Sequence, residues 1–348
     1  MHESRASTAI TALAILATIA GGVPARAQNA VADFYRGKTI TIIVGLPPGG
    51  SFDLYARLVG AHLGKHVPGL PNIVVQNMPG ASSLLQANHV FNVAAQDGTL
   101  IGAPSSNVPL QPLLNAAGVK YDSLKFQWLP TPADSPHTLF VWRSSPVRRV
   151  EDMRARETPI GALAPGSTPT VTIGLYNEVF KTKMRAVIGY TGLPAVMLAI
   201  ERGEAEGYAT MPLDTLRHSY KRLVEAGDIR VLAQSGETRL AALPDVPAAR
   251  EFARNDDDLA LLALGTASSK MTFPYMVGPG VPPERVAALR QAFMDTFADP
   301  DFLKEAAARE MSVRPIPAER VARLIGEAFA TPAPVVERLK TIYERGAK

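Results

Sequence analysis

Short apolar runs alternate with longer amphipathic segments over residues 39–104 of the chain. The runs at 39–45, 72–77 and 99–104 have the length and composition of buried strands. A glycine-containing turn follows each of the first two runs. The apolar positions after that turn recur at helical spacing, as in the predicted helix 51–65. This strand–helix–strand–helix–strand order predicts a parallel sheet with helices on its faces.

The same alternation restarts with a strand-like run at 137–142. A run at 185–190 opens the clearest strand–helix–strand unit of the chain. In this unit Pro194 lies near the first helical position and Gly203 ends the helix. The run at 229–235 closes the second set. Two sets of alternating elements predict two α/β lobes.

The first lobe is expected to be discontinuous in sequence. After the second set, the chain is predicted to be helical almost to its end, with a helix that starts near Glu284 behind a pair of prolines. We expect residues 28–135 and 270–348 to form the first lobe and residues 136–269 to form the second.

The N-terminal segment differs from the rest of the chain. A run of small and apolar residues, Ala9–Ala20, precedes Ala25 and Ala27, which have the spacing of a signal peptidase site. We expect residues 1–27 to be a cleaved signal peptide, so that the mature protein begins at Gln28 in a periplasmic space. The alternative is an uncleaved anchor, because the uncharged stretch is about the length of a membrane span.

Composition and charge exclude several classes of protein. The chain has 348 residues, a net charge of +4 without a long basic run, and no cysteine. We therefore expect no nucleic-acid partner, no disulfide and no lipid anchor on an N-terminal cysteine. The sequence contains neither a G-x-S-x-G nor an H-E-x-x-H motif. His62 and His66 have a metal-like spacing but are interpreted as part of a solvated helix face. The expectation is a monomer that is not an enzyme and needs neither a cofactor nor a metal.

Small, polar turns stand out as candidate chemistry, and most of them follow a predicted strand. They are Gly49-Gly50-Ser51, Gly80-Ala81-Ser82-Ser83, Ser105-Ser106-Asn107 and Gly166-Ser167-Thr168. Such turns present backbone N–H groups and hydroxyls at helix N-termini, which can solvate a carboxylate without any lysine or arginine. The alternative is that these residues only cap helices. The number of such turns in a two-lobed exported protein favours a ligand cleft at the carboxyl ends of the strands.

Several longer motifs carry a resemblance over nearly all of the mature chain. They are "GKTITIIVGLPPGGSFDLYARL", "VVQNMPGASSLLQANHV", "AAQDGTLIG", "GYTGLPAVMLAIERGEAEG", "IRVLAQSGETRLAALPDVPAAREF" and "VGPGVPPERVAALRQAFMDTFADPDF". With these motifs the chain resembles the Bug-type extracytoplasmic solute-binding proteins of the tripartite tricarboxylate transporter family. The resemblance implies a type II periplasmic-binding-protein fold, in which two α/β lobes close around a small carboxylated ligand.

The resemblance also implies which residues face the ligand. They are Gly49, Gly50, Ser51, Phe52, Asp53, Gly80, Ala81, Ser82, Ser83, Pro104, Ser105, Ser106, Asn107, Gly166, Ser167, Thr168, Tyr190, Gly192 and Thr210. The chain departs from its relatives at Phe52, where a hydroxyl or amide is usual, and at Ser82-Ser83, where two glycines are frequent. Thr210 stands where relatives commonly have an aspartate. These departures predict a carboxylate that lacks an amino group and has an apolar or aromatic body.

The expected function is that of a receptor that delivers an organic acid to a two-component membrane permease. A receptor that signals to a membrane sensor protein is the first alternative. A secreted α/β hydrolase or lyase is the second, and the absence of a nucleophile–base set in the sequence argues against it.

Overall fold

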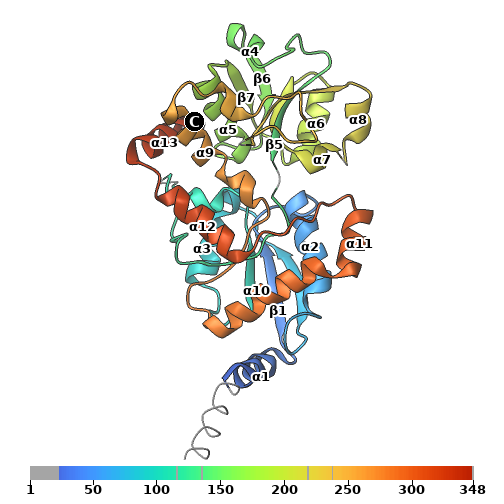
Figure 1. Ribbon diagram of the computed structural model, residues 1–348, viewed down its shortest axis with the longest axis vertical. Coiled ribbons are helices and arrows are strands. Elements are labelled where there is room, and N and C mark those ends of the chain that lie inside the picture. The colour runs from blue at the N-terminus through green and yellow to red at the C-terminus, as the bar shows by residue number, and fades with distance from the viewer. Residues whose placement is uncertain (1–22, 115–116, 135, 218, 237, 347–348) are drawn as a thin grey trace, which may run out of the picture.

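The computed structural model describes residues 23–346 apart from 115–116, 135, 218 and 237. It has two α/β lobes stacked along the long axis of the molecule (Figure 1). The two-lobed α/β architecture expected from the sequence is therefore confirmed. Most of the predicted signal peptide, residues 1–27, lies outside the described residues.

Helices and strands alternate along most of the chain. The strands are β1 (Thr39–Val44), β2 (Asn72–Asn77), β3 (Leu100–Ala103), β4 (Gln127–Leu129), β5 (His137–Trp142), β6 (Thr158–Gly161), β7 (Met184–Val187), β8 (Gly207–Pro212), β9 (Ile229–Gln234) and β10 (Tyr275–Val277). The helices are α1 (Val23–Tyr35), α2 (Ser51–Leu63), α3 (Leu84–Asn92), α4 (Asp152–Ala155), α5 (Thr168–Phe180), α6 (Leu193–Glu201), α7 (Leu213–Arg217), α8 (Lys221–Glu225), α9 (Asp256–Gly265), α10 (Pro283–Ala298), α11 (Pro300–Ala308), α12 (Ala318–Phe329) and α13 (Ala333–Gly346). Short 3₁₀ turns are η1 (Ala81–Ser83), η2 (Val108–Leu110), η3 (Ala249–Phe252) and η4 (Ala267–Met271).

The sheet of the first lobe has the strand order β2-β1-β3-β10-β4. Strand β1 pairs in parallel with β2 and β3, as the βαβαβ pattern predicts, and places Ile42 opposite Val75 and Ile101. Strand β10 runs antiparallel to β3 and β4. The chain thus returns to the first sheet at β10, close to the predicted residue 270. Strands β4 and β10 span only three residues each, which is too short for a recognisable sequence pattern.

The sheet of the second lobe has the order β7-β6-β8-β5-β9. Strand β6 is parallel to β7 and β8, and β5 is antiparallel to β8 and β9. Each sheet therefore has a parallel β-α-β core and two further strands. The strand predicted at 185–190 is shorter than expected and ends at Val187. The residues after it belong to the turn that leads to α6, and Pro194 stands at the start of that helix as predicted.

The last helix corrects the predicted division of the chain. Residues 270–348 were assigned to the first lobe, but α13 crosses back to the second lobe (Figure 1) and packs against α5 and α9. Its apolar face, including Leu339 and Ile342, is buried in the core of the second lobe. The other boundaries of the lobes stay a prediction.

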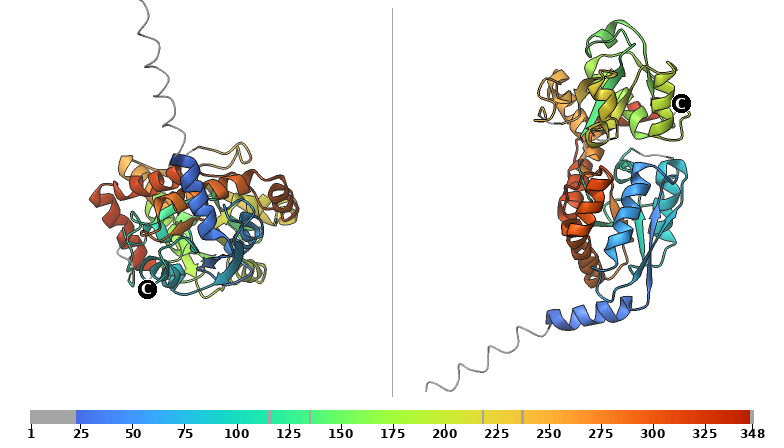
Figure 2. Two further views of the ribbon diagram at one scale, coloured as in Figure 1. Left: turned by 90° about the horizontal axis from the view of Figure 1, so that it is seen from below. Right: turned by 90° about the vertical axis from the view of Figure 1, so that its right-hand side faces the viewer.

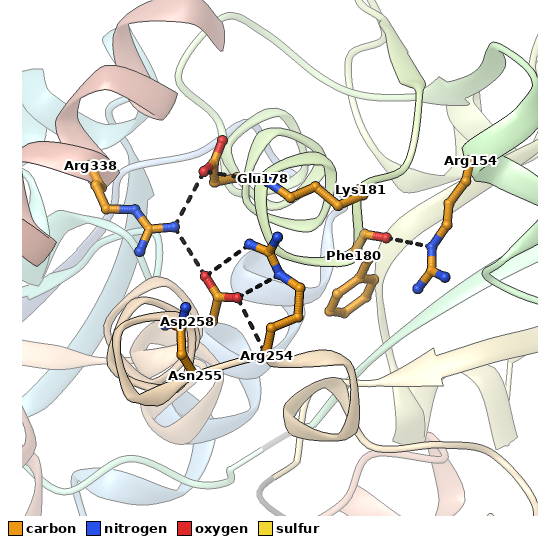
Figure 3. A network of polar contacts seen from close by, with 8 residues as sticks. All are labelled: Arg154, Glu178, Phe180, Lys181, Arg254, Asn255, Asp258 and Arg338. Atoms are coloured by element: carbon orange, nitrogen blue, oxygen red, sulfur yellow. Dashed lines mark hydrogen bonds and ion pairs between the residues drawn. The ribbon is translucent and has the colours of Figure 1, made fainter.

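A buried carboxylate fixes the position of α13. Asp258 of α9 is only 1% exposed and accepts hydrogen bonds from Arg254 at 2.9 Å and from Arg338 of α13 at 3.1 Å. Figure 3 shows both guanidinium groups directed at this carboxylate. Burial acts to raise the pKa of Asp258, but the hydrogen bonds from the two arginines outweigh it, so the pKa lies below its ordinary value. Because α13 bears Arg338, the ionised Asp258 ties this helix to α9.

His62, in α2, and His66, just after it, are mostly buried and paired, in contrast to their interpretation as a solvated helix face. The imidazole of His62 lies 2.7 Å from a carboxylate oxygen of Glu305, and that of His66 lies 2.8 Å from Asp299. The two carboxylates lie in and just before α11, more than 200 residues away in sequence, so no local pattern could have revealed them. These pairs attach α11 to the outer side of the first lobe.

The N-terminal helix α1 lies at the end of the first lobe and extends away from it (Figure 2). Val31 and Tyr35 on its C-terminal half are buried against the first lobe. Cleavage after Ala27 would leave this buried half in the mature protein. Among the helices in the described part of the chain, none is both long and apolar enough to cross a membrane.

Candidate functional site

The first predicted loop joins β1 to α2 and is held by Asp53. This carboxylate is 2% exposed and accepts hydrogen bonds from the backbone N–H of Gly49, from Arg57 and from Asn77, each at 2.9 Å. Burial acts to raise the pKa of Asp53, but these hydrogen bonds outweigh it, so the pKa is lowered. Asp53 was expected to contact the ligand. Its oxygen atoms are engaged within the first lobe, where they fix the shape of the Gly49-Gly50 turn, and its contact with a ligand stays a prediction.

The second predicted loop has an unusual backbone conformation. Ala81, Ser82 and Ser83 have φ values of 45°, 51° and 73°, so three successive non-glycine residues lie in the left-handed region. L-residues adopt this region at a cost of about 1–2 kcal/mol each. The sequence had already singled out Ser82 and Ser83 as positions where relatives often have glycine. A left-handed backbone favours glycine at these positions, and the contacts of Ser83 explain how serine is tolerated there.

The Ser83 side chain links the second loop to the ends of two strands. Its hydroxyl is buried, donates to the carbonyl of Gly45 after β1 at 2.9 Å, and accepts from the N–H of Ser105 after β3 at 3.0 Å. The approach is so close that a Cβ atom on Gly45 would lie 2.5 Å from the Ser83 hydroxyl oxygen. These contacts hold the strained loop in place and join the loops that follow β1 and β3.

The third predicted loop reaches the second lobe. The Ser105 hydroxyl lies 3.1 Å from the Ser82 carbonyl and also contacts the side-chain oxygen of Asn107. The Asn107 amide then donates to the carbonyl of Gly166 in the second lobe, at 3.4 Å. The predicted Asn107 and Gly166 turns, which are 59 residues apart, are thus in direct contact.

The predicted turn of the second lobe points its hydroxyls in two directions. Ser167 is buried, and its hydroxyl lies 2.9 Å from that of Thr170, which donates to the carbonyl of Ala164 at 2.7 Å. Ser167 therefore stabilises the start of α5 from within. Gly166, with φ +69°, and Thr168 line a cavity together with Asn107 of the first lobe. Gly166 needs to be glycine for a second reason, because a Cβ there would lie 2.8 Å from the hydroxyl of Tyr343.

A small cavity lies where these turns meet. Its volume is about 30 Å³, which is enough for one or two water molecules or for a group of similar size. The lining residues come from both lobes and carry no charge: Asn107, Leu110, Gln111, Leu114, Gly166, Thr168, Val171, Thr172, Gly265, Ser268, Leu339 and Tyr343. An uncharged cavity with amide and hydroxyl groups has the donors for a single carboxylate group and offers no ion-pair partner.

The structure brings Asn107, Gly166 and Thr168 together at this cavity, and the other predicted site residues do not line it. Those others are Gly49, Gly50, Ser51, Phe52, Asp53, Gly80, Ala81, Ser82, Ser83, Pro104, Ser105, Ser106, Ser167, Tyr190, Gly192 and Thr210. Most of those in the first lobe belong to the hydrogen-bonded loops described above. The other lining residues were not among the predicted ones, and they include Leu339 and Tyr343 of α13. Only the crossing of α13 to the second lobe brings them here, and no local motif marks them.

Three of the predicted site residues, Phe52, Thr210 and Tyr190, are each engaged away from the cavity. Phe52 is half-buried, with its ring edge-on to Phe273 at a centroid distance of 5.0 Å. Thr210 is buried within β8. The hydroxyl of Tyr190 lies 3.4 Å from a carboxylate oxygen of Glu204. Phe52 was expected to lie beside the ligand, and its contact with Phe273 joins it to the segment that leads into β10.

Comparison with known proteins gives the fold and the family. A UPF0065 protein of Cupriavidus necator is 24% identical over 93% of this chain and 94% of its own length. A Rhodopseudomonas palustris protein solved with adipate has a TM-score of 0.66 at 22% identity, over 87% of this chain and 97% of that one. MatC of the same organism, solved with bound malate, has a TM-score of 0.65 at 19% identity, over 88% and 99% of the two chains. All three matches extend over both lobes.

The family profile described as "Tripartite tricarboxylate transporter family receptor" matches residues 56–341, which is most of the chain and includes elements of both lobes. Its members are receptors that bind solutes and are not enzymes. The chain belongs to the receptor family of the tripartite tricarboxylate transporters, the family that its sequence motifs resemble.

Proposed function

We propose that this receptor binds a small carboxylate without an amino group between its two lobes and delivers it to a two-component membrane permease. The observation that carries the proposal is the contact between Asn107 of the first lobe and Gly166 of the second at an uncharged cavity. At 3.4 Å, the hydrogen bond between them is long. A carboxylate oxygen is a stronger acceptor than a carbonyl, so it can replace Gly166 as the partner of the Asn107 amide.

The lining of the cavity supports the preference for an acid without an ammonium group. A buried ammonium needs a carboxylate or several carbonyls as partners, and it is costly without them. None of the cavity-lining residues is acidic. Thr210 stands where the resemblance leads us to expect an aspartate. The ring of Phe52 packs against Phe273, so this residue supports the expected preference for an apolar or aromatic ligand less than the sequence suggested. Two similar structures were solved with malate and with adipate, which are carboxylates of this class.

A thermal-shift panel tests the ligand class. The panel contains aspartate, glutamate, citrate, short dicarboxylates such as malate and adipate, and benzoate. An acid without an amino group is expected to give the largest rise in melting temperature, because a ligand that binds only the folded state stabilises it by mass action. A larger shift with glutamate or aspartate than with every other acid would show that the argument from the uncharged lining is wrong.

Export through a cleaved signal peptide is part of the same proposal. We expect the mature protein to begin at Gln28, since Ala25 and Ala27 fit the small-residue preference of signal peptidase. N-terminal sequencing of protein recovered from the periplasm should find Gln28 or its cyclised form. Recovery of the chain with an intact Met1 in the membrane fraction would contradict this expectation and favour the anchor.

A further inference from the structure

The C-terminal helix α13 brings a tyrosine to the cavity between the lobes. Tyr343 is one of the lining residues, and its ring lies directly over the Gly166 turn. A Cβ atom placed on Gly166 would be 2.8 Å from the Tyr343 hydroxyl oxygen and 3.0 Å from the ring carbon that bears it. The hydroxyl is therefore close to the site where Asn107 contacts Gly166.

The helix that carries Tyr343 is anchored to the second lobe. One turn before Tyr343, Leu339 is buried in the core of the second lobe and also lines the cavity. Arg338 on the same helix is bound to the buried carboxylate of Asp258 and to Glu178 of α5 (Figure 3). A side chain fixed by its helix loses little conformational freedom when a ligand binds, which favours affinity.

The hydroxyl of Tyr343 has a hydrogen to donate and makes no hydrogen bond within the part of the chain that the structure describes. Partial burial raises its pKa above the ordinary value, so the phenol stays protonated at neutral pH. A half-buried donor beside an uncharged cavity can gain a partner without breaking an existing hydrogen bond.

We propose that Tyr343 is a ligand-binding residue whose hydroxyl donates a hydrogen bond to a carboxylate group held between Asn107 and Thr168. The cavity volume of about 30 Å³ suits one carboxylate group rather than a whole organic acid. One end of the acid therefore enters the cavity, displacing water, and the rest extends into the space between the lobes. This inference rests on the proposed function and adds to it a residue from the C-terminal helix.

Titration calorimetry on a matched pair of variants tests this role. Tyr343→Phe removes the hydroxyl and keeps the ring that packs over Gly166. Tyr220→Phe makes the same change at a half-buried tyrosine of the second lobe that does not line the cavity. The probes are adipate, malate, succinate, citrate and benzoate. We expect Tyr343→Phe to weaken the best-bound acid about tenfold, as for the loss of a hydrogen bond to a charged group. Tyr220→Phe should bind within about twofold of the unaltered protein.

The outcomes separate the inference from the function on which it rests. Melting curves without ligand show whether Tyr343→Phe is folded, and we expect a melting temperature close to that of the unaltered protein. If Tyr343→Phe binds as tightly as the unaltered protein while Asn107→Ala is weakened, the inference about Tyr343 is wrong and the proposed function stands. If the unaltered protein binds none of these acids, the proposed function fails and the inference fails with it.

Discussion

Replacing Asp53 with alanine is expected to lower the free energy of unfolding by about 3 kcal/mol. The change removes a carboxylate that is almost completely buried. It leaves the N–H of Gly49 without its acceptor and the amide of Asn77 with only the carbonyl of Leu46. Urea unfolding followed by circular dichroism measures the effect. The slope with denaturant should stay the same, since the surface exposed on unfolding hardly changes.

The effect of Asp53→Ala should also depend on pH in a defined direction. The pKa of Asp53 is lowered in the folded protein, so its contribution to stability is fully present above the ordinary carboxyl pKa of about 4. That contribution is lost as the pH falls through the lowered pKa of the folded state. The difference between the variant and the unaltered protein should therefore shrink in acid.

Asp33→Ala provides a control for the loss of a charge. Asp33 of α1 pairs with Arg36, the next residue after this helix, but both side chains are about two-thirds exposed, and such pairs contribute little. We expect a change within about 0.5 kcal/mol for this variant. Equal effects of the two substitutions would contradict the assignment of Asp53 as the residue that holds the first loop.

Gly45→Ala is expected to destabilise the first lobe by about 2–3 kcal/mol and to weaken carboxylate binding. The added Cβ would lie 2.5 Å from the hydroxyl oxygen and 2.6 Å from the Cβ of Ser83. Relief of this overlap moves Ser83 away from its contacts with Gly45 and Ser105, which join the loops that follow β1 and β3. Denaturant unfolding and the thermal-shift panel measure the two effects.

Two further variants show whether the overlap is the cause. Adding Ser83→Gly to Gly45→Ala removes the overlapping atoms, and the φ of +73° at Ser83 suits glycine. This double variant should regain part of the lost stability. Gly326→Ala, in α12, meets no atom within 4 Å and is expected to be neutral or to stabilise by up to about 1 kcal/mol. An unchanged stability of Gly45→Ala would contradict the close packing of the loops.

The parallel cores of both sheets could be predicted from the sequence because the patterns that identify their strands and helices lie within short, continuous stretches of the chain. Apolar runs separated by glycine turns identify β1, β2 and β3 within about 65 residues (39–103). The same is true of the unit from β7 to β8, with Pro194 at the start of its helix. Where the elements are short and paired over long distances, as for β10 with β3 and β4, no periodic pattern exists to be found.

The packing of α13 on the second lobe could not be predicted for a different reason. The amphipathic pattern of α13 indicates that one face is buried. It does not indicate which lobe covers that face, because both lobes have apolar surfaces. The choice depends on tertiary partners such as Asp258, which binds Arg338 of α13. The error in the assigned lobe and the omission of Tyr343 from the candidate site have this common origin.

The pattern of glycine and serine turns identified candidate loops. It did not show which of their hydrogen-bonding atoms are free to contact a ligand. Asp53 and Ser83 satisfy their hydrogen-bonding groups within the first lobe, whereas Asn107 and Thr168 face the cavity. Sequence patterns of this kind locate a turn at the end of a strand. The direction in which each side chain points depends on contacts with residues far away in the chain.

Small-angle scattering with and without a bound acid tests the central claim, that a carboxylate binds between the lobes. The acid is the one from the panel that raises the melting temperature most, added at saturation. Because the proposed site has groups from both lobes, binding should draw the lobes together and reduce the radius of gyration. An unchanged radius of gyration at saturation would contradict the account and indicate a rigid site within a single lobe.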